Sequence, residues 1–253
     1  MINGQVRGPV LVTGAASGIG RATARLLRAA DLPVALVDRE PSGMAAAAAA
    51  GSDCLHLTCD VADSTGMGAA FEEATGAFGP LAGVVSAAGT LIPGGLEDTT
   101  DDDFATHLAV NARGTLNALR GAHRHVRDGG AVVVVSSNAA RVPRTGMLAY
   151  AASKGAASAL ARAAGLELAT RGVRCNVVEP GSTDTPMQRA LWPDAEAGLR
   201  SALHGDPAQF RVGIPLGRIA DPGDVAATIC FLLSPAARHL TLQQLFVDGG
   251  ASL

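Results

Sequence analysis

Val10-Leu-Val-Thr-Gly14-Ala-Ala-Ser-Gly18-Ile-Gly20 is the stretch that decides the fold. A short apolar run enters a glycine-rich turn, and the turn opens directly into a predicted helix. Gly14 permits the tight turn. Gly18 and Gly20 let the backbone approach a pyrophosphate held at the positive N-terminus of the helix. A glycine-rich turn between strand and helix also occurs without a ligand, so the neighbouring elements decide whether a dinucleotide binds here.

Asp38 stands at the end of the second predicted strand, eighteen residues after Gly20. At this place a carboxylate accepts hydrogen bonds from the adenosine ribose hydroxyls and repels a 2′-phosphate. Asp38 therefore predicts NAD as the cofactor, although the guanidinium of the next residue, Arg39, is of the kind that suits NADP.

Apolar, β-rich runs alternate with helical stretches along the chain. Most runs are continuously apolar, as expected for parallel strands buried on both faces. The predicted strands are Val10–Val12, Pro33–Val37, Cys54–Thr58, Leu81–Ser86, Ala131–Ser136, Val173–Val178 and Gln243–Val247. The predicted helices are Gly18–Ala30, Asp63–Phe78, Thr100–Val126, Leu148–Arg171 and Pro222–Leu233. This pattern predicts an α/β fold, a single doubly wound Rossmann domain over residues 1–253 with a seven-stranded parallel sheet.

Two segments depart from the alternation. Met44–Ala50 is rich in alanine, and we expect a surface helix without chemistry there. Residues 182–214 follow the sixth strand, and a connection of this length inside a compact domain is usually functional. We expect it to form a lid over the substrate, with Trp192 as a packing anchor within the lid.

Composition argues against several classes of function. The net charge is −3 and no basic stripe is visible, so we expect no nucleic-acid partner. No apolar run approaches the ~18 residues of a membrane span, and the N-terminal residues lack the pattern of a signal peptide. The four cysteines have no zinc-site spacing and the six histidines are scattered, so we expect no metal. These features predict a cytoplasmic protein with reduced thiols.

Tyr150 and Lys154 are four residues apart in a predicted helix and therefore share one face. A free tyrosine titrates near pH ~10, which makes it a poor base at neutral pH. A cation fixed nearby favours the phenolate and lowers the pKa. The pair therefore predicts a general acid/base for moving a hydroxyl proton, and beside a dinucleotide this chemistry is hydride transfer.

With these motifs in order, almost the whole chain resembles the short-chain dehydrogenase/reductase family. The matching segments are Thr13–Gly20 (TGxxxGxG), Asp60-Val61 (the acidic position that touches adenine), Ser86–Gly89 (NNAG, with serine for the first asparagine), Asn111–Gly114 (the helix asparagine motif) and Pro180–Thr183 (the PG segment beside nicotinamide). Ser137 lies thirteen residues before Tyr150, where the family has its catalytic serine.

The resemblance implies a catalytic role for four residues. Tyr150 as phenolate would remove the hydroxyl proton, and Ser137 would hold the substrate oxygen. Lys154 would lower the Tyr150 pKa and bind the nicotinamide ribose, and Asn111 would hold a water that links Lys154 to solvent. The implied cofactor-binding residues are Gly14, Ser17, Gly18, Ile19, Gly20, Asp38, Asp60, Val61, Ala87, Ala88, Gly89, Asn111, Tyr150, Lys154, Pro180, Gly181 and Thr183.

Segments outside the family signature resemble a narrower group, the 2,3-dihydro-2,3-dihydroxybenzoate dehydrogenases of catecholate siderophore pathways. These segments are Pro143–Met147, Gly172–Trp192, Gly213–Gly217, Leu240–Gln243 and Val247–Gly250. The resemblance implies NAD-dependent oxidation at C3 of the diol, after which the ketone enolises to 2,3-dihydroxybenzoate. The candidate substrate-binding residues are Ser137, Arg144, Met147, Met187 and Gln188. Arg144 would grip the carboxylate bidentately.

Two further hypotheses stay open. The first is the same chemistry on 2,3-dihydro-3-hydroxyanthranilate or another cyclic alcohol. Glu179 stands where the narrower group has serine, and it would favour a protonated amine at C2 unless it simply faces a neighbouring helix. The second is a non-catalytic regulator that binds dinucleotide, against which the intact Ser137, Tyr150 and Lys154 argue. The resemblance and the alanine-rich long helices also predict a homotetramer.

Overall fold

The computed structural model describes residues 6–45 and 53–252, and its core is one parallel sheet. The strand order is β3-β2-β1-β4-β5-β6-β9. The strands are β1 (Val10–Thr13), β2 (Val34–Asp38), β3 (Cys54–Thr58), β4 (Leu81–Ser86), β5 (Val126–Val135), β6 (Arg174–Pro180) and β9 (Gln244–Val247). The chain winds outward from β1 to β3 and then returns to β4 on the other side of β1. A ligand site is expected at this switch point, outside the carboxyl ends of the strands.

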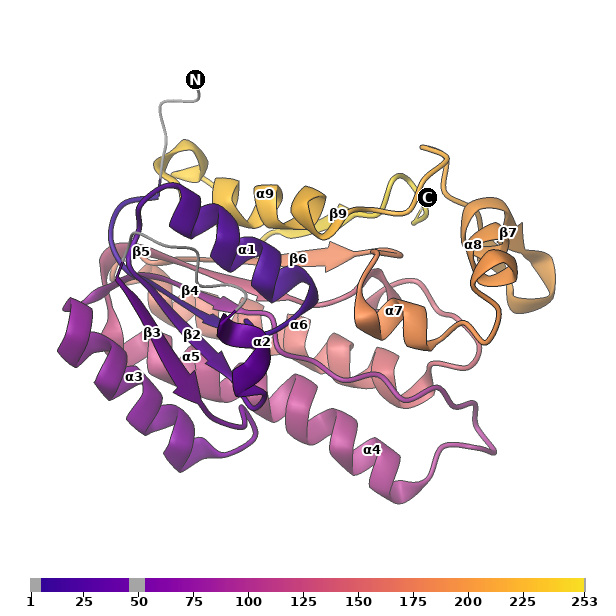
Figure 1. Ribbon diagram of the computed structural model, residues 1–253, viewed down its shortest axis with the longest axis horizontal. Coiled ribbons are helices and arrows are strands. Elements are labelled where there is room, and N and C mark those ends of the chain that lie inside the picture. Colours follow the sequence, from indigo (N-terminus) through magenta and orange to yellow (C-terminus); the bar gives the residue numbers. More distant parts are fainter. Residues whose placement is uncertain (1–5, 46–52, 253) are drawn as a thin grey trace.

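Helices cover both faces of the sheet, as Figure 1 shows. One face packs against α1 (Gly18–Ala29) and α9 (Pro222–Leu233), which also contact each other. The other face packs against α3 (Ser64–Phe78), α5 (Gly114–His125) and α6 (Leu148–Ala169). The central strands bury side chains on both faces, which explains their continuously apolar sequences. The prediction of a doubly wound sheet of seven parallel strands is confirmed.

The predicted helix Thr100–Val126 is wrong in its detail. Thr100 is the N-cap of α4 (Asp101–His107) and forms a capping box with Asp103. A π-helical segment, Leu108–Arg113, then separates α4 from α5. Because a π segment widens the turn, it shifts the side chains that follow it, and such segments are frequent at functional sites. Asn111 lies within this segment.

Two other expectations need correction. A short helix, α2, begins earlier than predicted and spans Pro41–Ala45, with Met44 buried in the core; residues 46–50 of the expected surface helix lie outside the described part of the chain. The segment after β6 contains regular elements rather than an irregular loop. These are α7 (Pro186–Ala190), α8 (Ala195–His204), a 3-10 turn (Pro207–Gln209) and a hairpin of two short strands, β7 (Gly205–Asp206) and β8 (Arg211–Val212). In Figure 1, α7, α8 and β7 lie beyond one end of the sheet.

The described residues include no helix whose length and hydropathy would allow it to cross a bilayer.

Candidate active site

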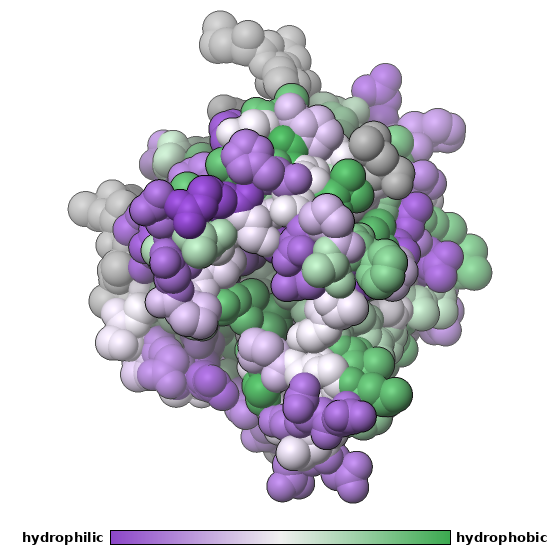
Figure 2. All heavy atoms as spheres, turned by 90° about the vertical axis from the view of Figure 1, so that its right-hand side faces the viewer, coloured by the Kyte–Doolittle hydropathy of each residue, from purple (hydrophilic) through white to green (hydrophobic). Residues whose placement is uncertain are grey.

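A cavity of about 450 Å³ opens at the carboxyl ends of β1, β4, β5 and β6. This volume lies within the range of roughly 300–1,000 Å³ typical of small-molecule sites. In Figure 2 the surface is hollowed at this end of the molecule, with hydrophobic residues in the recess and hydrophilic residues around it. Except for Asn111, every cofactor, catalytic and substrate residue proposed above lines this cavity. The fold therefore brings together residues that are up to 174 positions apart, from Gly14 to Gln188.

The glycine turn is packed so closely that two of its glycines cannot carry a side chain. Gly14 has a positive φ of 71°, and a Cβ there would lie 2.7 Å from the Ala88 nitrogen. A Cβ on Gly20 would lie 2.2 Å from the Gly14 carbonyl oxygen, so Gly20 serves the closure of α1 against the turn. Gly20 also lines the cavity, so its role toward a pyrophosphate stays a prediction. Gly18, by contrast, faces only the side chain of Thr185.

The turn is held open toward the cavity by polar contacts. Thr13 at the end of β1 accepts hydrogen bonds from the backbone nitrogens of Ala87 (3.1 Å) and Ala88 (3.3 Å), which follow β4. Asp38 accepts hydrogen bonds from the backbone nitrogens of Ala16 (2.9 Å) and Glu40 (3.1 Å). Because each carboxylate oxygen has more than one lone pair, Asp38 keeps acceptor capacity for a ligand hydroxyl on the cavity side.

Tyr150 and Ser137 lie together in the cavity. Tyr150 on α6 is 8% exposed, and burial raises the pKa of its phenol. A hydrogen bond from Ser137 and the positive charge of Arg144 oppose that rise in pKa. The site therefore stabilises the phenolate through two groups that come from the segment between β5 and α6.

Lys154 lies on α6 with Tyr150 and lines the same cavity. Its ammonium is buried and donates a hydrogen bond to the Val135 carbonyl at 3.0 Å, and it lies 5.9 Å from the Tyr150 ring centroid. Desolvation lowers the pKa of Lys154 to about 8. The positive charge of Arg144 is one cause that lowers the Tyr150 pKa.

The pKa of Lys154 predicts a pH-dependent effect on stability. Below pH about 8 both the folded and the unfolded wild-type chain carry the charge. Between about 8 and 10.5 the folded protein has released the proton while the unfolded chain keeps it, so wild-type stability rises with pH. The methionine in Lys154→Met cannot titrate. The unfolding free energy of the variant minus that of the wild type is therefore expected to fall by about 1.4 kcal/mol per pH unit across this window.

Urea unfolding of both proteins at stepped pH measures this difference. The hydrogen bond lost at Val135 adds a constant offset, so only the slope is diagnostic. A difference that stays the same from neutral to alkaline pH would mean that Lys154 is not desolvated.

Asn111 lies behind the cavity wall rather than in it. Its side chain accepts a hydrogen bond from the Thr90 nitrogen (2.9 Å) and donates to the Thr90 oxygen (3.0 Å) and to the Ser153 hydroxyl (2.9 Å). Both Asn111 Oδ1 and Lys154 Nζ would lie 3.2 Å from a Cβ placed on Gly89. Asn111 therefore connects the π segment with α6 and with the loop after β4, close to Lys154.

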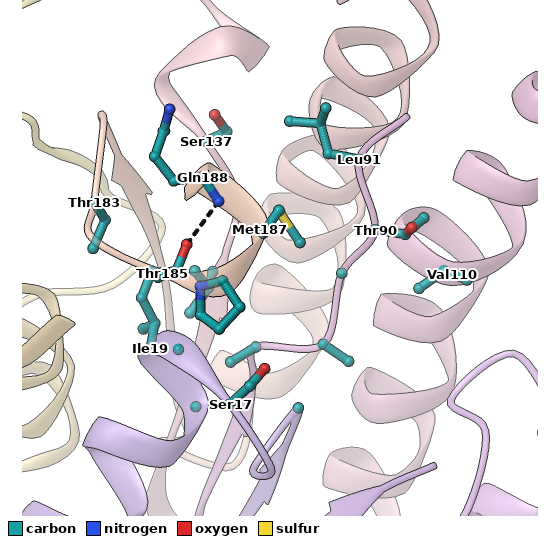
Figure 3. Close-up of a pocket in the computed structure, with 18 of the residues that line it drawn as sticks. Ser17, Ile19, Thr90, Leu91, Val110, Ser137, Thr183, Thr185, Met187 and Gln188 are labelled. Carbon is teal, nitrogen blue, oxygen red and sulfur yellow. Dashed lines mark hydrogen bonds between the residues drawn. The ribbon is translucent and has the colours of Figure 1, made fainter. Parts of the chain in front are cut away.

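The substrate end of the cavity is covered by α7. Figure 3 shows Thr185, Met187 and Gln188 of this region near Ser17 and Ile19 of the glycine turn, with Thr90 and Leu91 on another side. The Thr185 hydroxyl caps α7 by accepting a hydrogen bond from the Gln188 nitrogen at 3.2 Å. Trp192 packs on Gly198, where a Cβ would lie 2.2 Å from the indole, and does not line the cavity. Trp192 thus packs within the segment after β6, as predicted.

Glu179 does not line the cavity, although we considered it for substrate choice. Its side chain is 0% exposed and faces α6, where it accepts a hydrogen bond from Ser158 at 3.2 Å. It also accepts from Gln244 on β9 (2.8 Å) and pairs with Arg141 at 3.5 Å. Of the two alternatives, the structure supports contact with a neighbouring helix.

Sequence reasoning missed His107, which packs edge-on against Tyr150 with ring centroids 6.2 Å apart. Its Nε2 accepts a hydrogen bond from the Ile92 nitrogen at 3.0 Å, and its Nδ1 lies 2.7 Å from the Asp103 oxygen. These contacts assign a neutral ring with the proton on Nδ1. His107 is therefore a structural support for the Tyr150 ring, and only the fold reveals it.

Comparison with known proteins gives consistent matches. A family model described as enoyl-(acyl carrier protein) reductase matches residues 14–252. The 2,3-dihydro-2,3-dihydroxybenzoate dehydrogenase of Bacillus subtilis (strain 168) is 40% identical over 248 residues, covering 96% of this chain and 95% of the relative. The enzyme of the same name from Escherichia coli (strain K12) is 42% identical over 246 residues, covering 96% of each chain.

Solved structures also match almost the whole chain. A short-chain dehydrogenase from Burkholderia cenocepacia in complex with NADP has a TM-score of 0.85 and 34% identity, covering 96% of this chain and 97% of that one. A 3-ketoacyl-(acyl-carrier-protein) reductase from Brucella melitensis complexed with NADH has a TM-score of 0.85 and 28% identity, covering 98% and 99%. These two proteins show that the fold accommodates either dinucleotide.

Proposed function

The chain belongs to the short-chain dehydrogenase/reductase family of oxidoreductases, and from this premise we propose that it oxidises 2,3-dihydro-2,3-dihydroxybenzoate to 2,3-dihydroxybenzoate with NAD. The observation that carries the proposal is the arrangement of Tyr150 between Ser137 and Arg144 in one cavity. It combines a base, a hydroxyl for the reacting oxygen and a cation suited to a carboxylate. The relatives of the same name at 40% and 42% identity support the choice of substrate.

A nicotinamide dinucleotide fits the residues present. The glycine turn leaves backbone nitrogens at the N-terminus of α1, which favours phosphate oxygens. Asp38, Asp60 and Val61 line the same cavity, and we assign the adenosine to their end of it. Bound NAD⁺ would supply the acceptor for the hydride from C3. Asp38 favours NAD over NADP because a carboxylate repels a 2′-phosphate.

Residues of the chain itself then transfer the proton and hold the substrate. Tyr150 as phenolate takes the proton of the C3 hydroxyl, and Ser137 donates a hydrogen bond that holds the reacting oxygen. Arg144 favours the phenolate and also offers two parallel N–H groups to the substrate carboxylate. Loss of the proton and of hydride converts the alcohol to a ketone, which enolises to the aromatic catechol. Lys154 and Asn111 support the site from behind Gly89.

An NADH-formation assay with three substrates tests the proposal. We expect the highest kcat/KM with the 2,3-dihydro diol, a lower value with 2,3-dihydro-3-hydroxyanthranilate and the lowest with an uncharged cyclic alcohol. Glu179 does not line the cavity, which favours this order because Glu179 is the residue that would favour an amine at C2. Faster turnover of the amino analogue would support the alternative substrate. No NADH with any of them would support the non-catalytic regulator.

We also propose that residues 182–214 act as a lid, that residues 1–253 form a single catalytic domain, and that the enzyme is a homotetramer. The cover that α7 gives to the cavity supports the lid. Exposed apolar side chains on two helices, Phe104 on α4 and Leu166 on α6, support assembly. Light scattering at micromolar protein is expected to give four times the 25.3 kDa chain mass, and a monomer mass would refute this assembly.

A further inference from the structure

Arg211 has an unusual position within the segment after β6. Its neighbours Phe210 and Val212 are 84% and 53% exposed, whereas the Arg211 side chain is partly buried. This is the reverse of the usual partition, in which arginine stays in solvent and phenylalanine is covered. A buried charge is costly unless it has a partner. The inward position of the Arg211 side chain therefore indicates a partner for its guanidinium.

The β7–β8 hairpin holds Arg211 in this position. Gly205 pairs with Val212 and has a positive φ of 84°, and a Cβ on Gly205 would lie 2.5 Å from the Arg211 carbonyl oxygen. The Ile214 nitrogen then donates to the Leu203 oxygen at 2.9 Å, which ties the end of the hairpin to α8. The backbone at Arg211 is therefore determined by close packing rather than by the charge of its side chain.

The Arg211 guanidinium reaches the wall of the cavity. Its Nη2 donates a hydrogen bond to the Ser182 hydroxyl at 2.8 Å, and Ser182 lines the cavity directly after β6. The Ser182 carbonyl in turn accepts a hydrogen bond from the Ala220 nitrogen at 3.0 Å. Arg144 lines the same cavity from the segment before α6. Arg211 does not line the cavity itself but contacts it through Ser182, whereas Arg144, 67 residues earlier in the chain, lines it directly.

Each of the two arginines lacks an anion of its own. Burial lowers the pKa of both guanidinium groups, and the charge of Arg211 lowers the pKa of Arg144 further. Neither takes part in any ion pair within residues 6–45 and 53–252. The acids that act on them at a distance are engaged elsewhere. Asp248 accepts from Asn138 (3.3 Å) and from the Gly250 nitrogen (3.0 Å), and Asp206 accepts from the Ala208 nitrogen (3.1 Å).

We propose that Arg211 and Arg144 together form the binding subsite for the substrate carboxylate, with Arg211 as a specificity-determining residue. A carboxylate between two guanidinium groups relieves their mutual repulsion and supplies the charge-assisted hydrogen bonds that each lacks. The assignment deepens the proposed function and rests on it for the identity of the substrate. Arg211 would neutralise the charge of the carboxylate, so that Arg144 can also lower the pKa of Tyr150.

Arg211 is the more informative of the two positions. Arg144 acts on the Tyr150 pKa, so its loss disturbs the chemical step as well as carboxylate binding. The test therefore compares Arg211→Gln and Arg144→Gln with Arg200→Gln as a matched control, because Arg200 is an exposed arginine of α8 whose charge is paired with Glu196.

The measured quantity is the ratio of kcat/KM for the dihydro diol acid to kcat/KM for the same diol without its carboxylate. A lost charge-assisted hydrogen bond corresponds to about a tenfold to hundredfold fall in this ratio. We expect that fall for Arg211→Gln and for Arg144→Gln, and no fall for Arg200→Gln. Because the two arginines share one carboxylate, the double variant is expected to lose less than the product of the single losses.

A second readout does not depend on turnover. Benzoate binding, measured by calorimetry with benzyl alcohol as the uncharged comparison, is expected to weaken at least about tenfold in Arg211→Gln. Weakened benzoate binding in a protein that does not oxidise the diol acid would refute the proposed function and keep the arginine subsite. An enzyme that oxidises the diol acid, with the ratio and benzoate affinity unchanged in Arg211→Gln, would overturn the subsite and keep the function.

Discussion

Tyr150→Phe is expected to lower kcat about 10²- to 10⁴-fold, the range that a positioned general acid/base contributes. Phenylalanine fills the same buried space and keeps the edge contact with His107. What it loses is the oxygen that takes the proton of the substrate hydroxyl. NAD affinity is therefore expected to stay nearly unchanged, because in the proposed function the dinucleotide is held mainly by the glycine turn and Asp38.

Assays of NADH formation measure kcat, and a calorimetric titration with NAD measures the affinity for the cofactor. Thr170→Val is a suitable control, because it also removes a hydroxyl at an end of α6, one that only bonds the Glu167 carbonyl. Retention of a large fraction of wild-type kcat by Tyr150→Phe would place the base elsewhere.

The wild-type pH profile follows from the same residue. Burial raises the pKa of Tyr150 above its ordinary value, and the phenolate is the form that accepts the proton. Oxidation is therefore expected to speed up as pH rises through the alkaline range. In Arg144→Gln this limb is expected to move to higher pH, because the charge of Arg144 lowers the Tyr150 pKa.

NAD is expected to be preferred over NADP by more than about 100-fold in kcat/KM, since like charges placed side by side cost several kcal/mol. Asp38→Asn is the sharpest variant for this test. Asparagine keeps an acceptor for the Ala16 nitrogen, so the glycine turn stays in place while the negative charge is removed. The preference for NAD is expected to fall by about tenfold or more, with Arg39 then free to attract the 2′-phosphate.

Asp31→Asn serves as the control for this variant. It removes a carboxylate from the loop before β2, at the opposite end of the strand from Asp38, and its left-handed backbone (φ 57°) accepts asparagine. Equal kcat/KM values for NAD and NADP in the wild-type enzyme would show that Arg39 outweighs Asp38.

Local chemistry made much of this protein predictable from its sequence. Apolar, β-rich runs identified all seven strands of the sheet, and the start of Pro222–Leu233 was predicted because Asp221 and Pro222 mark a helix start. The glycine turn and the Tyr150–Lys154 pair were also visible, because their geometry depends on residues within a few positions of each other. Such features need no knowledge of distant contacts.

Tertiary structure alone decided the charges and contacts around the reactive centre. The sequence identified Lys154 as a cation near Tyr150 because the two share a helix face, whereas the effect of Arg144 on the Tyr150 pKa depends on the tertiary structure. Asn111 is behind the cavity wall because a π segment widens its helix, and Glu179 faces α6 because of the side of β6 that it occupies. Arg211 turns inward because Gly205 packs against its backbone. Electrostatic interactions depend on distance and on exclusion of water, and both are set only when segments far apart in the chain come together.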